Sequence, residues 1–277
     1  MFKRCLLAVI VALLVTSSQI AAAAEDYDWS QAPRIGTKSK FASYIESERR
    51  KGNTTFRVVL INGLKVDTID DFANNLALVP YVEIKGTWKG LGNERIANMT
   101  YKINEYPGTR VANAYLSRNQ QQAWLNLTNE EQQLYNIAVG IVDEANKYSS
   151  EREKARYIHD EICKRVKEYK NENDRNKTAV GALIDGYAHC GGFTDAFYML
   201  GRMSGLNVGR IGGLAKDENG QWTIKHGWNW ITFSDGKSYC IDVTNGFNTK
   251  GTYLFCATKE RMEKTHSCDW EIIPNLQ

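Results

Sequence analysis

Long hydrophobic runs are missing from this sequence after its first 15 residues. A helix that spans a bilayer needs about 20 consecutive apolar residues, so no later segment is predicted to cross a membrane. Low-complexity stretches and short-period repeats are also missing, which favours a globular chain. Its 277 residues are enough for one large domain or two small ones.

An excess of charge of one sign is missing too. The formal net charge is +3 at pH 7, and it falls to +1 without residues 1–24, because Lys3 and Arg4 are lost with no acidic residue. Nucleic acids bind strongly basic surfaces, so no nucleic-acid partner is predicted.

Metal-binding motifs are absent as well. The sequence has neither CxxC nor HxxxH spacing, and it has no calcium-loop pattern. A zinc ion held by His189, Cys190 and His226 is therefore not predicted. No cofactor is expected.

The first 24 residues are typical of a secretory signal peptide. Lys3 and Arg4 form a basic start, an apolar run extends to residue 15, and small residues 21–24 precede Glu25. An uncleaved membrane anchor is the alternative, although the apolar run is shorter than a span requires. We therefore predict an exported chain, secreted or held in the cell envelope, with no stable membrane span after cleavage.

Cysteines after residue 24 are odd in number: Cys163, Cys190, Cys240, Cys256 and Cys268. In an exported chain this leaves at least one thiol unpaired in the monomer. The four besides Cys190 allow up to two disulfides, whose pairing the sequence does not define. Free thiols are the equally open alternative.

Residues 38–118 are predicted to form a small α+β unit after a loose leader at residues 25–37. Apolar periodicity indicates helices over residues 41–50 and 67–78. β-Branched or alternating segments indicate strands over residues 55–61, 82–88, 95–104 and 110–116. The unit has no clustered histidines or cysteines, so packing or recognition is its expected role.

Residues 119–277 have a different character and begin with two predicted helices. Thr128 and Glu131 form a capping-box pattern before a helix that is expected to end near residue 147. Ser150 precedes a second helix, predicted over residues 151–169. These helices lead towards the segment in which reactive residues gather.

A helix is predicted to begin at or beside Cys190. Apolar residues follow it at helical spacing: Phe193, Ala196, Phe197, Leu200 and Met203. A thiol at a helix N-terminus faces unpaired backbone N–H groups, which favour the thiolate. Gly191 and Gly192 are expected to leave the backbone bare, so that a substrate carbonyl approaches the amides. The alternative is a small core cysteine in a glycine-rich turn.

His226 and Asp242 lie on the two arms of a predicted hairpin. A two-residue turn at residues 235–236 places them on opposite faces of the sheet. A three-residue loop at residues 234–236, with Gly236 in the left-handed region, pairs Trp228 with Asp242 and His226 with Thr244. The two side chains then share a face, roughly 7–8 Å apart at the backbone. A catalytic role for both residues requires the longer loop.

These motifs together resemble the transglutaminase-like superfamily. The matching stretches are residues 179–193 (AVGALIDGYAHCGGF), 226–230 (HGWNW) and 239–246 (YCIDVTNG), and residues 153–169 resemble the helix that precedes the nucleophile in bacterial members. The resemblance covers about residues 127–260. It implies an α+β chain whose C-terminal part, residues 119–277, is a papain-like domain with a nucleophile helix packed on an antiparallel sheet.

The resemblance implies a catalytic triad of Cys190, His226 and Asp242. Cys190 would attack an amide carbonyl and form a thioester, His226 would act as base and then acid, and Asp242 would orient the imidazole. The backbone N–H of Cys190 would be one oxyanion donor. Tyr169 is the candidate for a second donor, with packing at a helix end as its alternative.

Asn229 is expected on the sheet face opposite His226, where it supports the sheet or is simply exposed. The substrate implied is a peptide or protein amide, with a cell-wall peptide as one case. Hydrolysis and crosslinking both remain open. The alternative to an enzyme is a catalytically silent fold used to bind a protein or the cell wall.

Overall fold

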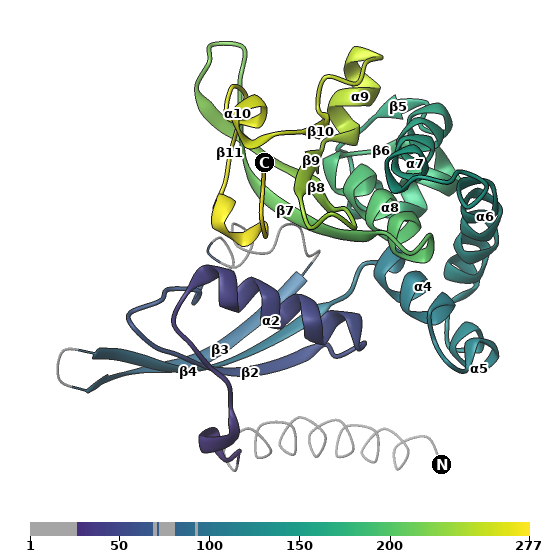
Figure 1. The fold of residues 1–277 in the computed structure, drawn as a ribbon. Coiled ribbons are helices and arrows are strands. Elements are labelled where there is room, and N and C mark those ends of the chain that lie inside the picture. The colour runs from purple at the N-terminus through teal and green to yellow at the C-terminus, as the bar shows by residue number, and fades with distance from the viewer. Residues whose placement is uncertain (1–26, 69–70, 72–80, 92–93) are drawn as a thin grey trace, which may run out of the picture.

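The computed structural model describes residues 27–68, 71, 81–91 and 94–277 (Figure 1). The predicted signal peptide over residues 1–24 and most of the helix predicted over residues 67–78 lie outside these ranges. Within them the chain is α+β, as predicted. None of the described helices combines the length and the apolar character that a membrane span needs.

The N-terminal sheet has four strands in the order β1-β2-β4-β3. They are β1 (Arg34–Ile35), β2 (Thr55–Leu60), β3 (Tyr81–Leu91) and β4 (Glu94–Asn104). The last three confirm predicted strands, and β4 pairs antiparallel with both β2 and β3. β1 pairs in parallel with β2 through Arg34 and Val59, so the leader predicted over residues 25–37 contributes a strand to this sheet.

Helix α2 (Lys38–Arg50) lies across one face of this sheet (Figure 1). The side-chain oxygen of Thr37 caps it by accepting a hydrogen bond from the backbone N–H of Lys40 at 3.3 Å. Phe41 and Ile45, four positions apart and therefore on one helix face, are fully buried. Each such side chain contributes about 1.5–3 kcal/mol through burial.

The C-terminal sheet has five strands in the order β10-β9-β8-β7-β11, and every pair is antiparallel. They are β7 (Asn207–Lys216), β8 (Trp222–Thr232), β9 (Ser238–Ile241), β10 (Phe255–Ala257) and β11 (His266–Ser267). Helices gather beside this sheet (Figure 1): α4 (Pro107–Tyr115), α5 (Gln120–Leu125), α6 (Asn129–Ala145), α7 (Glu151–Arg165), α8 (Cys190–Met203) and α9 (Val243–Thr249).

Shorter elements complete the described chain. A two-stranded parallel sheet consists of β5 (Glu168–Tyr169) and β6 (Tyr187–Ala188). The remaining helical turns are η1 (Trp29–Gln31), η2 (Asp174–Lys177), the π-turn η3 (Gly181–Asp185), α10 (Lys259–Met262) and η4 (Trp270–Ile272).

The capping box predicted for α6 is confirmed. The backbone N–H of Thr128 donates to the carboxylate of Glu131 at 2.9 Å, and the backbone N–H of Glu131 donates to the hydroxyl of Thr128 at 3.3 Å. α7 begins with the same motif at Ser150 and Glu153.

The helix predicted over residues 151–169 is too long by one turn. α7 ends at Arg165, and Tyr169 lies instead in strand β5. The backbone N–H of Lys167 donates to the carbonyl of Gly186 at 2.8 Å rather than to a carbonyl of its own helix. Pairing with β6 therefore replaces the last helical turn.

The strand predicted over residues 110–116 is wrong, because this segment belongs to helix α4. Pro107 stands in its first turn, where a missing N–H costs nothing and the fixed φ favours a helix. Val111, Ala112 and Ala114 are buried in the cluster that includes α6 and α8. A short segment with few apolar residues fits the spacing of a strand as well as that of a helix, so tertiary packing decided that it forms a helix.

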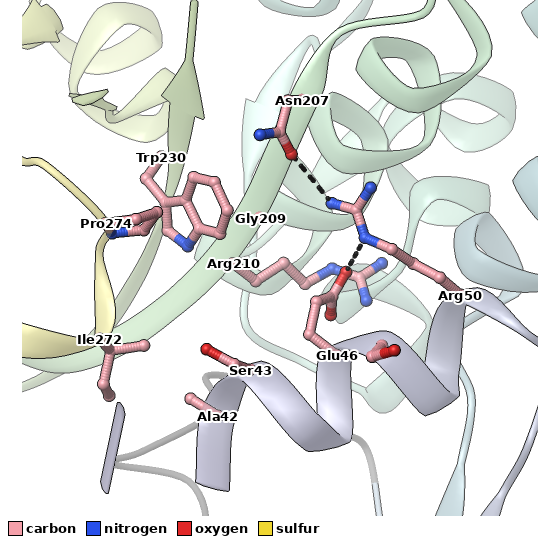
Figure 2. Close-up of a pocket in the computed structure, with 11 residues that line it drawn as sticks. Ala42, Ser43, Glu46, Arg50, Asn207, Gly209, Arg210, Trp230, Ile272 and Pro274 are labelled. Atoms are coloured by element: carbon pink, nitrogen blue, oxygen red, sulfur yellow. Dashed lines mark hydrogen bonds and ion pairs between the residues drawn. The ribbon is translucent and has the colours of Figure 1, made fainter. Parts of the chain in front are cut away.

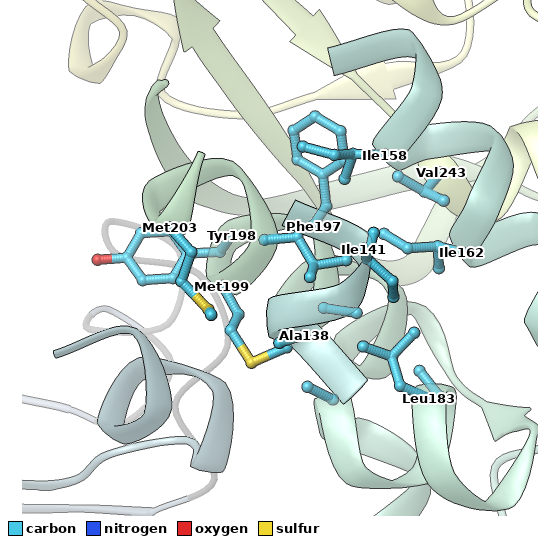
Figure 3. Packing of buried hydrophobic residues seen from close by; sticks show 14 of the residues in the cluster. Ala138, Ile141, Ile158, Ile162, Leu183, Phe197, Tyr198, Met199, Met203 and Val243 are labelled. Carbon is cyan, nitrogen blue, oxygen red and sulfur yellow. The ribbon is translucent and has the colours of Figure 1, made fainter. Parts of the chain in front are cut away.

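The largest apolar cluster lies between α8 and its neighbouring helices. Figure 3 shows Phe197 and Met199 of α8 among Ile141 of α6 and Ile158 and Ile162 of α7. All five are at most 2% exposed. This packing holds the nucleophile helix predicted from the sequence in a fixed position.

The C-terminal sheet is buried on both faces. One face packs against the cluster of α8, and the other packs against the cluster that contains α2 and the N-terminal sheet. The first face contributes Val208, Ile231 and Ile241, and the second contributes Ile211, Trp228 and Cys240.

Candidate functional site

Cys190 is the first residue of α8, as predicted, and His189 is its N-cap. The thiol therefore lies at the end of the helix where unpaired N–H groups create a partial positive charge. Cys190 is only 1% exposed. Its reactivity depends on the side chains that surround it.

The structure gives a different reason for glycine at positions 191 and 192 from the one predicted. A Cβ on Gly192 would lie 2.4 Å from the carbonyl oxygen of Asn176, and one on Gly191 would lie 2.9 Å from that of Lys177. The glycines thus let the turn η2 pack directly on the start of α8. They do not keep the backbone open for a substrate.

The three-residue hairpin loop is confirmed. Asn229 pairs with Ile241 and Thr232 with Ser238, and Gly236 has a φ of 81°. β9 ends at Ile241, however, so Thr244 lies in α9 and does not pair with His226. Asp242 stands between strand and helix as the N-cap of α9, where its Oδ1 accepts the backbone N–H of Asn245 at 3.1 Å.

The structure brings Cys190, His226 and Asp242 together. His226 Nε2 lies 3.0 Å from Asp242 Oδ2, and the Cys190 thiol and the His226 imidazole are close enough for each to shift the pKa of the other. The side chains of His226 and Asp242 are 11% and 3% exposed. The sulfur, the imidazole and the carboxylate thus form one row of groups that is largely shielded from solvent.

The electrostatics of these three side chains favour a Cys190 thiolate beside a His226 imidazolium. Burial alone would raise the pKa of Cys190, but hydrogen bonds and charges from His189 and His226 outweigh it and lower the pKa of the thiol to about 6. Burial likewise disfavours the His226 imidazolium, yet Asp242 and then Cys190 raise the pKa of His226 to about 10. Although burial opposes it, the pKa of Asp242 is held well below its usual range by His226 and His266.

The other cysteines of the described chain behave in the opposite way. Burial raises the pKa of Cys163 and of Cys240 to about 12, and that of Cys256 to about 11; burial also raises the pKa of Cys268. All five, including Cys190, are free thiols in the structure. The alternative without disulfides is therefore the one observed.

Tyr169 lies beside the nucleophile. Burial, followed by the charge of Cys190, raises the pKa of Tyr169 to about 12, while the nearby backbone N–H of Cys190 acts to lower it. Its ring centroid is 5.5 Å from that of His189. The hydroxyl is therefore next to the amide that would bind an oxyanion.

His189 also contacts the sulfur, because its Nδ1 lies 3.3 Å from Cys190 Sγ. Two imidazoles therefore act on the thiol, His189 at the start of α8 and His226 on β8. The only sequence signal for the contact with His189 is that His189 and Cys190 are adjacent in the chain.

Asn229 lies outside this centre. It is fully buried, and its amide donates to the carbonyls of Thr194 and Gly209, at 3.1 Å each. It therefore ties α8 to β7 across β8. This matches a sheet support, and it leaves no donor for an oxyanion.

His266 is the residue at this site that sequence reasoning missed. It lies on β11, opposite Ala215 of β7, and its Nε2 is 3.3 Å from Asp242 Oδ2. No local pattern marks it, because only the pairing of β11 with β7 brings it to the site. The ligand atoms of His226, Asp242 and His266 lie within 4.8 Å of one another, close enough to share a metal ion, but the attraction of the Asp242 carboxylate for both imidazoles already accounts for the arrangement.

A separate cavity of about 280 Å³ lies between α2 and strands β7 and β8 (Figure 2). Glu46 and Arg50 of α2 line it with Arg210 and Trp230 of the sheet. Arg50 donates to Glu46 at 3.0 Å and to the carbonyl of Val208 at 2.8 Å. The charged groups of this cavity therefore serve the junction between α2 and the sheet.

Part of the chain is similar to a known protein family. Residues 137–242 match the model of the transglutaminase-like superfamily, a segment that runs from α6 to Asp242 and contains all three triad candidates. A search of curated proteins found no match.

Solved structures with a similar arrangement include a TGase crystal structure, 16% identical over 77% of this chain, with a TM-score of 0.36. They also include the periplasmic domain of TgpA from Pseudomonas aeruginosa, 9% identical over 56% of this chain, with a TM-score of 0.34. The match spans 59% of the first of these chains and 56% of the second.

Proposed function

We propose, from the match of residues 137–242 to the transglutaminase-like superfamily, that this chain is a cysteine enzyme that transfers acyl groups from peptide or protein amides. Cys190 is the nucleophile, His226 the acid and base, and Asp242 the residue that orients the imidazole. One observation supports this most strongly. Among the described cysteines, Cys190 alone has a lowered pKa, and it alone is joined through an imidazole to a buried carboxylate.

The reaction begins with the Cys190 thiolate and the His226 imidazolium. The sulfur attacks the amide carbonyl carbon, and the negative charge moves to the carbonyl oxygen. The backbone N–H of Cys190 stabilises this oxyanion, and the Tyr169 hydroxyl, which lies near that N–H, donates a second hydrogen bond to it.

Collapse of this intermediate breaks the C–N bond. His226 gives its proton to the leaving amine, and a thioester on Cys190 remains. Water or a second amine then attacks the thioester, His226 takes the proton of the attacking group, and the thiolate is restored. Water gives hydrolysis and an amine gives a new amide, so the same residues serve both outcomes.

Export is part of this proposal. The basic, apolar and small-residue segments of residues 1–24 direct the chain out of the cytoplasm. Its amide substrates would then be peptides or proteins of the cell envelope or the surroundings.

The test compares the native chain with Cys190→Ala on a mixture of peptides that contains a tagged primary amine. We expect the native chain to produce new carboxyl ends or tagged peptides, both read by mass spectrometry, and Cys190→Ala to produce neither. Cys163→Ala, which removes a free thiol of α7, should keep the activity. Equal products from the native chain and Cys190→Ala would contradict the proposal and favour a binding module.

A further inference from the structure

We propose that His266 is a positioning residue of this centre. It holds the Asp242 carboxylate in place, so that Oδ2 of Asp242 can accept a hydrogen bond from His226. This inference rests on the proposed function, because it assigns a purpose to the orientation of His226. It goes beyond the segment that matches the family, since that segment ends at residue 242.

The Asp242 carboxylate has polar partners on three sides. Oδ1 accepts the backbone N–H of Asn245 at 3.1 Å. Oδ2 lies 3.0 Å from Nε2 of His226 and 3.3 Å from Nε2 of His266. A carboxylate oxygen has two lone pairs, so each imidazole can take one. Removal of either donor leaves a lone pair of a buried charge without a partner.

The tautomer of His266 follows from its other contact. Its Nδ1 lies 2.8 Å from the hydroxyl oxygen of Thr265. If Nδ1 carried the proton, the bare lone pair of Nε2 would face the negative carboxylate. The favourable arrangement has the Thr265 hydroxyl donate to Nδ1, so that the proton stays on Nε2 and points at Asp242.

The ring of His266 is fixed by packing as well. Its side chain is 5% exposed, and its centroid lies 4.8 Å from the Trp228 ring in an edge-to-face contact. The His226 ring is 5.3 Å away. Pairing of β11 with β7 fixes the backbone on which the ring stands. Packing and hydrogen bonding therefore hold the donor in one orientation.

Other titratable groups also act on this centre and belong to any account of its pH dependence. Cys190 of α8 and the adjacent His189 lie on the far side of His226. The groups that feel the charge of Asp242 from neighbouring elements are Cys240 of β9, His159 and Cys163 of α7, and Tyr169 of β5. None of these four has a polar atom paired with the Asp242 carboxylate, whereas Nε2 of His266 lies 3.3 Å from its Oδ2.

The test measures the rate at which iodoacetamide alkylates Cys190 as a function of pH, with the labelled peptide identified by mass spectrometry. His266→Phe keeps a ring against Trp228 but removes the donor. Asp242 then holds the His226 imidazolium less well, so the pH midpoint of alkylation should rise by about one unit, and kcat/KM should fall about 10-fold or more. His266→Gln keeps an N–H at the position of Nε2 and should restore most of both values.

Two further variants keep the test decisive. Thr265→Val removes the hydroxyl that fixes the tautomer, and it should move the midpoint in the same direction by less. His159→Gln removes an imidazole that is equally buried, at 2% exposure, and that interacts with Asp242 only through charge, so it should move the midpoint much less than His266→Phe does. Thermal unfolding identifies any variant that fails to fold, and Thr265→Val then replaces His266→Phe.

The outcomes separate this inference from the function on which it rests. If Cys190 of the native chain is alkylated at low pH, and His266→Phe and Thr265→Val have the same pH midpoint, the positioning role of His266 is wrong. The assignment of Cys190 as the nucleophile is then unaffected. If His266→Gln is as impaired as His266→Phe, the ring matters and the donor does not, which also overturns the inference. If the native chain itself reacts only like an ordinary thiol, the proposed function fails first.

Discussion

The sulfur of Cys190 shows how the contacts of a single side chain decide its chemistry. Cys240 is as buried as Cys190, and burial raises the pKa of Cys240 to about 12. Two imidazoles, His189 and His226, act on Cys190, and its pKa is lowered to about 6. They outweigh desolvation at Cys190, whereas at Cys240 the hydrogen bond from Trp228 does not, and the charge of Asp242 adds to the rise.

Tyr169→Phe tests the second oxyanion donor. The substitution keeps the ring against His189 but removes the hydroxyl beside the Cys190 backbone N–H. Loss of one such donor costs about 10²–10³-fold in kcat, and we expect a fall of that size with little change in KM. Steady-state kinetics on an amide substrate measure it.

Tyr187→Phe is the matched control for this variant. Tyr187 stands on the neighbouring strand β6, and its ring contacts Lys170 rather than Cys190. It should keep the native kcat. A Tyr169→Phe variant as active as Tyr187→Phe would show that the hydroxyl takes no part in the reaction.

At the scale of elements, a buried network positions α8 so that its first residue meets β8. Asp195 of α8 and Arg210 of β7 form an ion pair in which both side chains are at most 1% exposed. Asp195 also accepts the backbone N–H groups of Ala179 at 2.8 Å and Gly108 at 3.1 Å. One carboxylate thus links the nucleophile helix to β7, to α4 and to the turn before η3.

Asp195→Ala should be strongly destabilising for this reason. It leaves the Arg210 guanidinium buried without its counter-charge, which typically costs about 3–5 kcal/mol. The free energy of unfolding from urea titrations measures the loss. Glu144→Ala, which removes half of an exposed pair with Lys147, should change it by less than about 1 kcal/mol. Equal losses in the two variants would mean that the network does not hold α8.

Local signals in the sequence were sufficient for α6 and for the start of α8, which caps and apolar spacing located. They were not sufficient at the hairpin, because residues 234–236 allowed both a two-residue turn and a three-residue loop. The structure has the three-residue loop, with Gly236 at a positive φ, and this loop sets the register that brings Asp242 to the face of His226.

Local signals failed where a neighbouring element competes for the same backbone. Residues 110–116 became helix because α8 and α6 offer a helical partner. Tyr169 left its predicted helix for a strand because β6 accepts its backbone. The two glycines after Cys190 accommodate η2, which no property of residues 190–192 predicts.

At the scale of the whole molecule, the N-terminal unit and the C-terminal sheet share an apolar cluster. The hydroxyl of Tyr198, on α8, donates to Glu46 of α2 at 2.6 Å. The buried pair of Arg49 and Glu105 joins α2 to the segment after β4, with 2.9 Å between Nε and Oε1. The unit without apparent chemistry therefore braces the sheet face opposite α8.

The site is also assembled from distant parts of the chain. His266 reaches Asp242 only because β11 completes the edge of the sheet beside β7. A sequence pattern can order a cysteine, a histidine and an aspartate, but it carries no signal for a second histidine that arrives by strand pairing.

We expect the folded chain to hold Cys190 and His226 as a thiolate and an imidazolium within a defined pH window. Below about pH 6 the thiol is protonated, and above about pH 10 the imidazole is neutral. Catalysis needs the thiolate for attack and the imidazolium for proton donation. It should therefore rise through the first value and fall through the second.

Alkylation of Cys190 by iodoacetamide across pH tests this central claim most directly, because it needs no substrate. In the folded native chain the rate should rise with a midpoint near pH 6. In His226→Ala, or in the native chain unfolded in urea, the midpoint should move towards the value of an ordinary thiol, about 8.5. A folded chain whose Cys190 reacts only near that higher value, with or without His226, would contradict the account.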